Sequence, residues 1–230
     1  MQLVVSILVL LLVAGLTIFV LRQNAQARTP TITEHTPESA QGPLQSIVLG
    51  MGCFWGAEKR MGSLPGVIGV ESGYANGEVN GAYEAVLAHE RLLKLGIGKK
   101  RNHAEVVKVT FDPSQISLEQ VLARFWESHN PTQGNRQGND VGSNYRSAIY
   151  VHSLEQQKLA LMSRELYQAA LASAGLGEIT TEIEPLKIYY PAEYEHQGYL
   201  ERNPGGYCGL GGTGVKYPIL KPRENSSEEM

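Results

Sequence analysis

Cys53 is the residue of this chain whose surroundings point most clearly to chemistry. It follows Gly52 and precedes the aromatic pair Phe54 and Trp55, where a short apolar run turns into a helical pattern. The unpaired N–H groups and the positive dipole end at a helix start stabilise a thiolate, which is both a nucleophile and a redox centre. This pattern predicts a reactive cysteine. The alternative is a structural cysteine buried among aromatic side chains, since unpaired cysteine is among the most buried residue types.

The second cysteine, Cys208, lies in the glycine-rich segment 203–212. We expect this segment to be mobile, because it has few side chains to bury. A cysteine in a fixed position and another on a moving segment suggest a reversible disulfide couple. The alternative is a permanent disulfide that ties the tail to the core. Chain entropy does not separate the two, because either link would stabilise the fold.

The segment 104–111 predicts a strand with a carboxyl group on its apolar face. Alternation places Glu105 on the same face as Val107, Val109 and Phe111. Burial there would raise the pKa of Glu105 and keep it protonated near neutral pH, so that it can act as a general acid. The alternative is a glutamate at a strand end that bends into solvent.

Tyrosine outnumbers phenylalanine by 11 to 4, and several tyrosines lie in or beside expected loops. Tyrosine hydroxyls, together with a carboxylate such as Asp140, can hold a neutral polar oxygen. The alternative is that each is an amphipathic surface residue. The tyrosines concerned are Tyr74, Tyr83, Tyr145, Tyr194, Tyr199 and Tyr207.

Apolar periodicity and turn signals indicate the elements that must position these residues. Capping boxes begin two helices, at Ser117 with Gln120 and at Ser153 with Gln156. The first six elements run strand, helix, strand, strand, helix, strand. This order predicts an α+β fold, a two-layer sandwich with a split β-α-β (ferredoxin-like) core. The expected strands are 46–49, 67–74, 105–111, 147–151, 179–184 and 186–190, and the expected helices are 54–61, 118–128 and 153–173.

The N-terminus differs in composition from the rest of the chain. Residues 3–21 carry no charge, close to the ~20 residues that a helix needs to cross a bilayer. We expect an N-terminal transmembrane helix, with a cleaved secretion signal ending near 25–27 as the alternative. A membrane location follows, with the folded domain expected on the extracytoplasmic side. The cytoplasmic side is the alternative, because Arg22 and Arg28 follow the span.

The expected boundaries are an anchor or signal segment at 1–22, a linker at 23–44, the folded domain at 45–220 and a flexible tail at 221–230. A net charge of −3 leaves no basic face for nucleic acid. Two cysteines are too few for a disulfide scaffold, and too few for a cysteine-based structural zinc site without several histidine ligands. We expect a monomer.

Five motifs occur in order along the chain. They are Gly52-Cys53-Phe54-Trp55-Gly56, His103-Ala104-Glu105-Val106-Val107, Phe111-Asp112-Pro113, Gln137-Gly138-Asn139-Asp140-Val141-Gly142 with Tyr145-Arg146-Ser147, and Asn203-Pro204-Gly205-Gly206-Tyr207-Cys208. Together they resemble the peptide-methionine (S)-S-oxide reductases, the A-type methionine sulfoxide reductases, over about residues 46–218.

The resemblance implies that oxidised methionine-containing proteins, or free methionine-S-sulfoxide, are the substrates. Cys53 would be the nucleophile that becomes a sulfenic acid, and Cys208 the resolving cysteine that condenses with it. Thioredoxin or a similar dithiol would then reduce the disulfide, with no metal or organic cofactor.

The resemblance also assigns the other site residues. Phe54 and Trp55 match residues that receive the S-methyl group, and Glu105 matches the acid that protonates the sulfoxide oxygen. The remaining assignments are Tyr83 and Tyr145 as hydrogen-bond donors to that oxygen, Asp140 as a carboxylate that orders the site through water, and His196 and Tyr199 on the substrate-binding side.

Two departures from the family pattern stand out. Residues 84–102 are longer than the usual link and end in a basic cluster, which indicates a solvated excursion or a surface for protein substrates or anionic lipid. Lys216 stands where some relatives have a further cysteine, so the disulfide relay would end at Cys208.

Two other functions are consistent with the residues alone. A cysteine hydrolase would need a histidine base, for which His103, His129 and His196 are candidates. A membrane-tethered binding module on the same fold would need no reactive cysteine at all.

Overall fold

The computed structural model of the chain describes residues 43–207 and 209–218. The expected membrane segment at 1–22, nearly all of the linker and the tail at 221–230 lie outside these residues. Within them, no helix is both long enough and apolar enough to span a bilayer.

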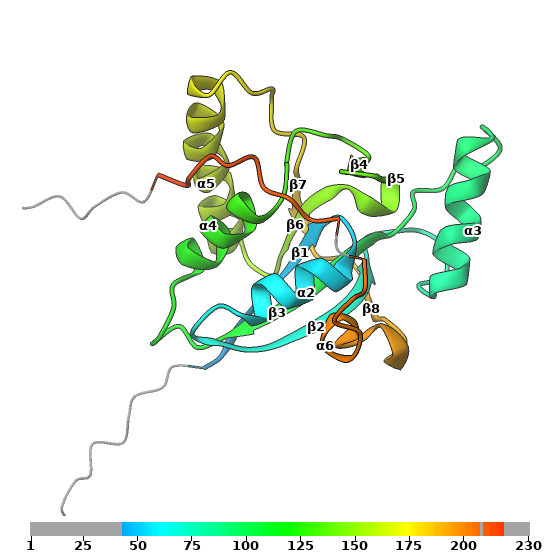
Figure 1. Cartoon of the computed structure of the whole chain (residues 1–230), viewed down its shortest axis with the longest axis horizontal. Coiled ribbons are helices and arrows are strands. Elements are labelled where there is room, and N and C mark those ends of the chain that lie inside the picture. Colours follow the sequence, from blue (N-terminus) through cyan, green and yellow to red (C-terminus); the bar gives the residue numbers. More distant parts are fainter. Residues whose placement is uncertain (1–42, 208, 219–230) are drawn as a thin grey trace, which may run out of the picture. The chain divides into compact units, whose positions relative to one another are not determined.

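Six strands of the described chain form one mixed sheet (Figure 1), in the order β7-β6-β1-β3-β2-β8. β1 and β3 lie at its centre and pair antiparallel, with Leu49 opposite Val107. Neighbouring strands are antiparallel throughout, except that β6 and β7 are parallel. The strands are β1 (Gln45–Met51), β2 (Val67–Ala75), β3 (Ala104–Phe111), β6 (Ser147–Val151), β7 (Glu182–Pro185) and β8 (Tyr189–Pro191).

Two split β-α-β units build the central sheet. The first runs through β1, helix α2 (Phe54–Gly62) and β2, and β3 lies between its two strands. The second runs through β3, helix α4 (Leu118–Ser128) and β6, and β1 lies between its strands. The predicted α+β class is therefore confirmed. Helix α5 (Leu154–Ser173) follows β6 and contacts α4, β6 and β7.

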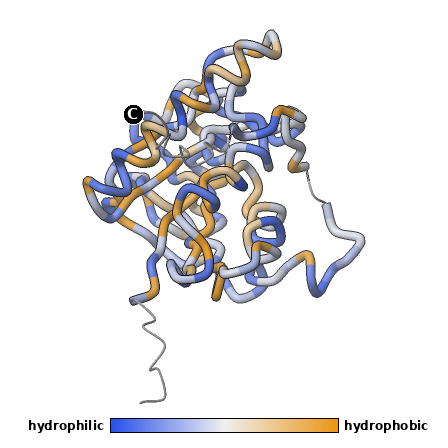
Figure 2. Tube along the Cα trace, turned by 90° about the vertical axis from the view of Figure 1, so that its left-hand side faces the viewer, coloured by the Kyte–Doolittle hydropathy of each residue, from blue (hydrophilic) through white to orange (hydrophobic). Residues whose placement is uncertain are grey.

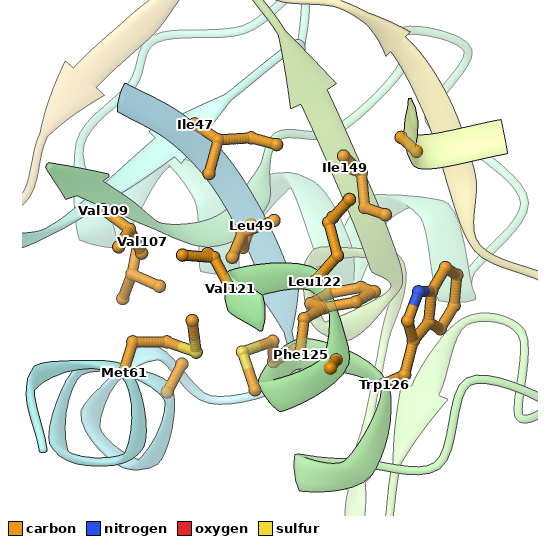
Figure 3. Close-up of a cluster of buried hydrophobic side chains, with 14 of the residues drawn as sticks. Ile47, Leu49, Met61, Val107, Val109, Val121, Leu122, Phe125, Trp126 and Ile149 are labelled. Atoms are coloured by element: carbon orange, nitrogen blue, oxygen red, sulfur yellow. The ribbon is translucent and has the colours of Figure 1, made fainter. Parts of the chain in front are cut away.

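The main core lies between this sheet and the helices α2, α4 and α5 (Figure 3). Ile47 and Leu49 alternate along β1 toward the helices and are fully buried, as are Met61 of α2 and Phe125 of α4. Full burial of one such side chain stabilises the fold by about 1.5–3 kcal/mol. Hydrophobic and hydrophilic residues alternate along much of the trace (Figure 2), which matches elements buried on one side only. The site therefore stands on a well-packed platform.

The capping box that begins α4 has the predicted geometry. Gln120 N donates to Ser117 Oγ at 3.2 Å, and Ser117 N donates to Gln120 Oε1 at 2.9 Å. At α5 only half of the box forms. Ser153 Oγ accepts from Gln156 N, but Gln156 Oε1 accepts from His152 N instead of from Ser153.

The regions expected to be irregular contain short elements. Residues 76–103 include helix α3 (Tyr83–Lys94), which lies at the edge of the domain (Figure 1). No side chain caps its start at Ala82, so the usual signal of a helix start is missing. The other short elements are β4 (Arg136–Gln137), β5 (Asp140–Val141), the 3-10 turns η1 (Ser143–Tyr145) and η2 (Tyr194–His196), and helix α6 (Tyr199–Arg202).

Candidate active site

Cys53 stands at the junction between β1 and α2. Gly52 before it has φ +93°, and a Cβ there would lie 2.6 Å from the Cβ of Gln137. Only glycine makes this turn without strain, because other residues disfavour that φ and have no room beside Gln137. Cys53 itself is the N-cap residue of α2 and is half-buried. The chain thus turns sharply to place the sulfur at the first N–H groups of the helix.

The pKa of the Cys53 thiol lies above its ordinary value, which overturns the expectation of a thiolate at rest. Burial raises this pKa most, and the negative charge of Glu105 raises it further. The N–H groups of Trp55 and Gly56 lower it, as a helix start should, but they do not outweigh burial. The thiol therefore keeps its proton at neutral pH before substrate binds.

Glu105 is buried beside this cysteine, and the alternative in which it bends into solvent is wrong. The side chain is 2% exposed, at the start of β3. Its Oε2 accepts a hydrogen bond of 3.3 Å from Phe54 N, and its Oε1 accepts one of 3.1 Å from Asn144 Nδ2. Burial raises the pKa of Glu105 to about 8, although both donors lower it. A carboxyl with this pKa is mostly protonated at pH 7 and can donate a proton.

Two tyrosines approach the same centre from different elements. Tyr83 begins α3, and Tyr145 ends η1. For both, burial raises the pKa first, and the charge of Glu105 raises it next, with Cys53 contributing as well. Both hydroxyls therefore remain protonated and lie within electrostatic reach of Glu105 and Cys53. The long link after Tyr83 does not remove this tyrosine from the site.

An aromatic cluster lies next to Cys53. Trp55 stacks on Tyr199 with ring centroids 3.8 Å apart, and its Nε1 donates to His196 Nδ1 at 3.2 Å. The His196 ring lies 5.4 Å from Phe54 and 4.4 Å from Tyr83, between centroids. The structure thus brings together the residues expected to bind substrate and forms an apolar wall from them.

Asp140 approaches from β5. Burial raises its pKa, while a hydrogen bond from Tyr207 lowers it. Its charge acts on both Cys53 and Glu105, raising the pKa of each. Asp140 therefore belongs to the same electrostatic cluster.

Cys208 lies outside the described residues, but the chain that follows it is anchored. Arg60 of α2 donates through Nη2 to the Leu210 carbonyl at 2.7 Å, and Leu210 is 6% exposed. Tyr217 is also buried, and its N–H donates to Glu127 Oε1 at 2.8 Å. Within the segment expected to be mobile, Leu210 is therefore held by its burial and by Arg60, while Gly211 and Gly212 are exposed.

Two residues that contact the site, Asn144 and Glu193, were not predicted from the sequence. The Tyr74 hydroxyl donates to Glu193 Oε2 at 2.9 Å, and Tyr83 N donates to Glu193 Oε1 at 2.8 Å. Tyr74 is fully buried in β2 with its ring 5.6 Å from Phe54, so it is neither a loop nor a surface residue. Asn144 stands among the motif residues 137–147 and could have been noticed, whereas Glu193 has no signal in the sequence.

All three candidate histidine bases have other hydrogen-bond partners, and His196 accepts from Trp55 Nε1 through its Nδ1. His129 is fully buried with Phe125 O and Ser147 Oγ on its two nitrogens, and burial lowers its pKa to about 4. His103 accepts from Gly77 N and contacts Val79 O. In the part of the chain that the structure describes, no histidine is hydrogen-bonded to Cys53. The same residues contain no cluster of three or more His, Cys, Asp or Glu side chains that could hold a metal ion.

A cysteine beside a buried, mostly protonated carboxyl and two tyrosines is an arrangement typical of a thiol-based oxidoreductase. The comparisons with known proteins give the family. The chain belongs to the peptide methionine sulfoxide reductase family, whose model matches residues 45–222. It is an enzyme that reduces peptide methionine sulfoxide.

Similar proteins include the peptide methionine sulfoxide reductase MsrA 1 of Synechocystis sp., which is 52% identical over 177 residues, covering 76% of this chain and 75% of that protein. The MsrA of Ectopseudomonas mendocina is 53% identical over 177 residues, covering 76% of each. Among solved structures, methionine sulfoxide reductase A of Corynebacterium diphtheriae superposes with a TM-score of 0.65 at 42% identity, covering 74% of this chain and 79% of that one.

Proposed function

We propose that the enzyme reduces the S epimer of methionine sulfoxide, in proteins or free, with Cys53 as nucleophile and Glu105 as proton donor. The observation that carries this proposal is the buried carboxyl of Glu105, with its pKa near 8, bound to the N–H of the residue next to Cys53. A sulfoxide oxygen is a poor leaving group until it is protonated. A neutral acid fixed beside the nucleophile supplies that proton.

In the first step, the sulfur of Cys53 attacks the sulfoxide sulfur while the oxygen is protonated. Glu105 gives its proton to the oxygen and takes up the thiol proton, so that its own charge is unchanged at the end. The hydroxyl oxygen then passes to the Cys53 sulfur, so that the S–O bond of the sulfoxide and the transient bond between the two sulfurs both break. The methionine sulfur gains two electrons and leaves as a thioether. Cys53 loses two electrons and becomes a sulfenic acid, so one thiol and one sulfoxide give one sulfenic acid and one thioether.

In the second step, the Cys208 thiol condenses with the sulfenic acid and releases water. The resulting Cys53–Cys208 disulfide is reduced by exchange with thioredoxin or a similar dithiol, which is itself oxidised to a disulfide. The thiols carry all the electrons, so the sequence of steps uses no metal or organic cofactor. Oxidised proteins are the natural substrates and repair is the role.

The aromatic cluster would select the epimer. Phe54 and Trp55 offer an apolar surface for the S-methyl group, and the hydroxyls of Tyr83 and Tyr145 are donors for the oxygen. With methyl and oxygen assigned to different sides, only one configuration at sulfur leaves the attack path from Cys53 open. This selection agrees with the use of one enzyme for each sulfoxide epimer.

The test is a single turnover followed by recycling. Wild type, Cys53→Ser and Cys208→Ser are mixed with methionine-S-sulfoxide, and methionine is measured with no reductant and then with thioredoxin or dithiothreitol. We expect no methionine from Cys53→Ser. Cys208→Ser should release one methionine per enzyme and lose recycling by thioredoxin. The R epimer is the control, and ester cleavage without methionine would favour the cysteine hydrolase.

The membrane location also belongs to this proposal. The uncharged stretch 3–21 supports a membrane-spanning helix. The resemblance of the N-terminus to an export signal favours the extracytoplasmic side for the catalytic domain. A compartment-sensitive reporter fused to the C-terminus tests it. A reporter active only in the cytoplasm would reverse the orientation, and a chain recovered wholly in the soluble fraction would exclude the anchor.

A further inference from the structure

A buried carboxylate in α3 holds a turn that belongs to the active site. Glu90 is 7% exposed and faces Ser143, the first residue of η1. Its Oε1 accepts a hydrogen bond of 3.0 Å from Ser143 N, and its Oε2 accepts one of 2.5 Å from Ser143 Oγ. Asn102 Nδ2 donates a third, of 3.1 Å, to Oε2. Glu90 thus binds both donors of one residue and one donor from the chain just before β3.

These contacts keep Glu90 ionised. Burial raises its pKa, but the donors from Ser143 and Asn102 and the charge of Lys94 outweigh burial and hold the pKa below its ordinary value. Hydrogen bonds to a charged acceptor are about twice as strong as those between neutral groups. Loss of the carboxylate would leave the buried donors without their acceptor, and the turn would have to move to pair them again.

The turn held by Glu90 carries two side chains of the site. Asn144 donates to Glu105 at 3.1 Å, and Tyr145 lies close enough to Glu105 for that charge to raise its pKa. A Cβ on Gly142 would lie 2.5 Å from Asn144 Oδ1 and 3.0 Å from Glu90 Oε1. The Glu90 carboxylate and the Asn144 side chain therefore both lie close to Gly142, at the start of the turn.

The same helix also carries Tyr83. Residues 83 and 90 are seven apart, so they lie on one face of α3, and Val86 on that face is fully buried. Helix α3 thus carries Tyr83 and, through Glu90, also holds the turn η1 that carries Tyr145. The two hydroxyls approach Glu105 from α3 and from η1, and their separation depends on the contact between Glu90 and Ser143.

We propose that Glu90 is a positioning residue, which fixes Asn144 and Tyr145 on Glu105 and on the sulfoxide oxygen by holding Ser143. This rests on the proposed function, in which those groups protonate and bind that oxygen. Glu90 touches no reacting atom. Its effect is on the rate of the first step and on the proton affinity of Glu105.

The test compares Glu90→Gln and Glu90→Ala with Arg91→Gln, an exposed neighbour on the same helix. The first-step rate is measured as methionine released in a single turnover, as a function of substrate concentration and pH. Because a misplacement of about 1 Å can cost a factor of about 100, we expect Glu90→Ala to slow this step about 10- to 100-fold, with little change in the half-saturating concentration. Glu90→Gln keeps one acceptor oxygen, so its first-step rate should lie between those of wild type and Glu90→Ala. Arg91→Gln should have the wild-type rate.

The pH profile separates positioning from a general structural role. The Asn144 bond lowers the pKa of Glu105, so loosening it should move the alkaline fall of the rate, expected near pH 8 in wild type, to higher pH. A variant that is only less stable would contain fewer active molecules, but the pH at which the rate falls would not change. If the rate of both Glu90 variants falls at the same alkaline pH as that of wild type, the proposal is overturned.

A double variant provides a second criterion that does not depend on Glu90→Ala folding. If Glu90 acts through Ser143, then Glu90→Gln combined with Ser143→Ala should slow the first step less than the product of the two single effects. Effects that multiply would overturn the proposal, as would a wild-type rate in Glu90→Ala. Wild type that releases no methionine would instead refute the proposed function, and this is seen before any variant is compared.

Discussion

The backbone N–H of Phe54 donates a hydrogen bond of 3.3 Å to Oε2 of Glu105, 51 residues further along the chain. This bond joins the first turn of α2 to the start of β3. Cys53 precedes Phe54 directly, so the nucleophile and the acid share one fixed frame. The bond holds the Glu105 carboxyl against the backbone of the helix that Cys53 caps.

Glu105→Gln tests the proton donor. The amide has nearly the same shape and keeps an oxygen for the Phe54 N–H, but it cannot supply a proton. We expect the single-turnover rate of methionine release to fall about 100-fold or more, since general acid catalysis contributes about 10²–10⁴. Glu155→Gln, at an exposed glutamate in the first turn of α5, is the matched control. An unchanged rate would remove Glu105 from its role.

The raised pKa of Glu105 makes the stability of the enzyme depend on pH. The folded protein holds this proton up to about pH 8, whereas the unfolded chain releases it near 4.5. The folded state therefore binds more protons between these values, and stability falls as pH rises. Each pH unit costs about 1.4 kcal/mol, so wild type should lose roughly 4 kcal/mol more than Glu105→Gln between pH 5 and pH 8. Urea unfolding of both proteins at the two pH values measures this, and equal losses would contradict the buried, protonated carboxyl.

The reactivity of Cys53 should respond to the charge of Glu105. Burial is the main reason for the raised pKa of the thiol, and the Glu105 charge is the second. At pH 9 Glu105 is ionised in wild type, so Glu105→Gln should ionise Cys53 more readily and react faster with iodoacetamide. At pH 6.5 Glu105 is neutral in both proteins, and the two should react alike. A difference at pH 6.5 as large as that at pH 9 would show that the substitution acts by opening the site.

Sequence patterns predict those features of the site that depend on local structure. Alternation along β3 identifies the buried face of Glu105, and the Ser117–Gln120 capping box identifies the start of α4. Both signals lie within a few residues of what they predict. Cys53 and Tyr145, which belong to two of the five motifs, lie within electrostatic reach of each other in the structure.

The features that were missed depend on contacts between distant segments. No side chain caps the start of helix α3 at Ala82, so its first residue has no local signal in the sequence. Glu193 reaches Tyr74 and Tyr83 from more than 100 residues away. The pKa of Cys53 depends on how deeply the sulfur is buried, which no local pattern reports. The predicted helix start correctly placed Cys53 at the N-terminus of α2. Its burial, however, raises the pKa of the thiol, whereas the helix start alone predicted a lowered pKa.

The contact between Arg60 and Leu210 predicts an effect confined to the second chemical step. Arg60 stands seven residues after Cys53, in the last turn of α2, and its Nη2 holds the Leu210 carbonyl at 2.7 Å. Leu210 is two residues beyond Cys208 in sequence. This contact fixes Leu210, near the proposed resolving cysteine in sequence, relative to the helix that Cys53 caps.

Arg60→Gln should therefore slow disulfide formation and leave the first step unchanged. Methionine release in a single turnover reports the first step, and loss of titratable thiols after the sulfenic acid has formed reports the second. A guanidinium bond to a carbonyl contributes about 1.5–3 kcal/mol, so we expect a slowing of about 10-fold or more in the second step. Lys59→Gln, at the exposed neighbouring position, is the control. If both steps slow equally, Arg60 acts on the packing of α2 as a whole, whereas an unchanged second step would mean that the burial of Leu210 alone anchors this segment.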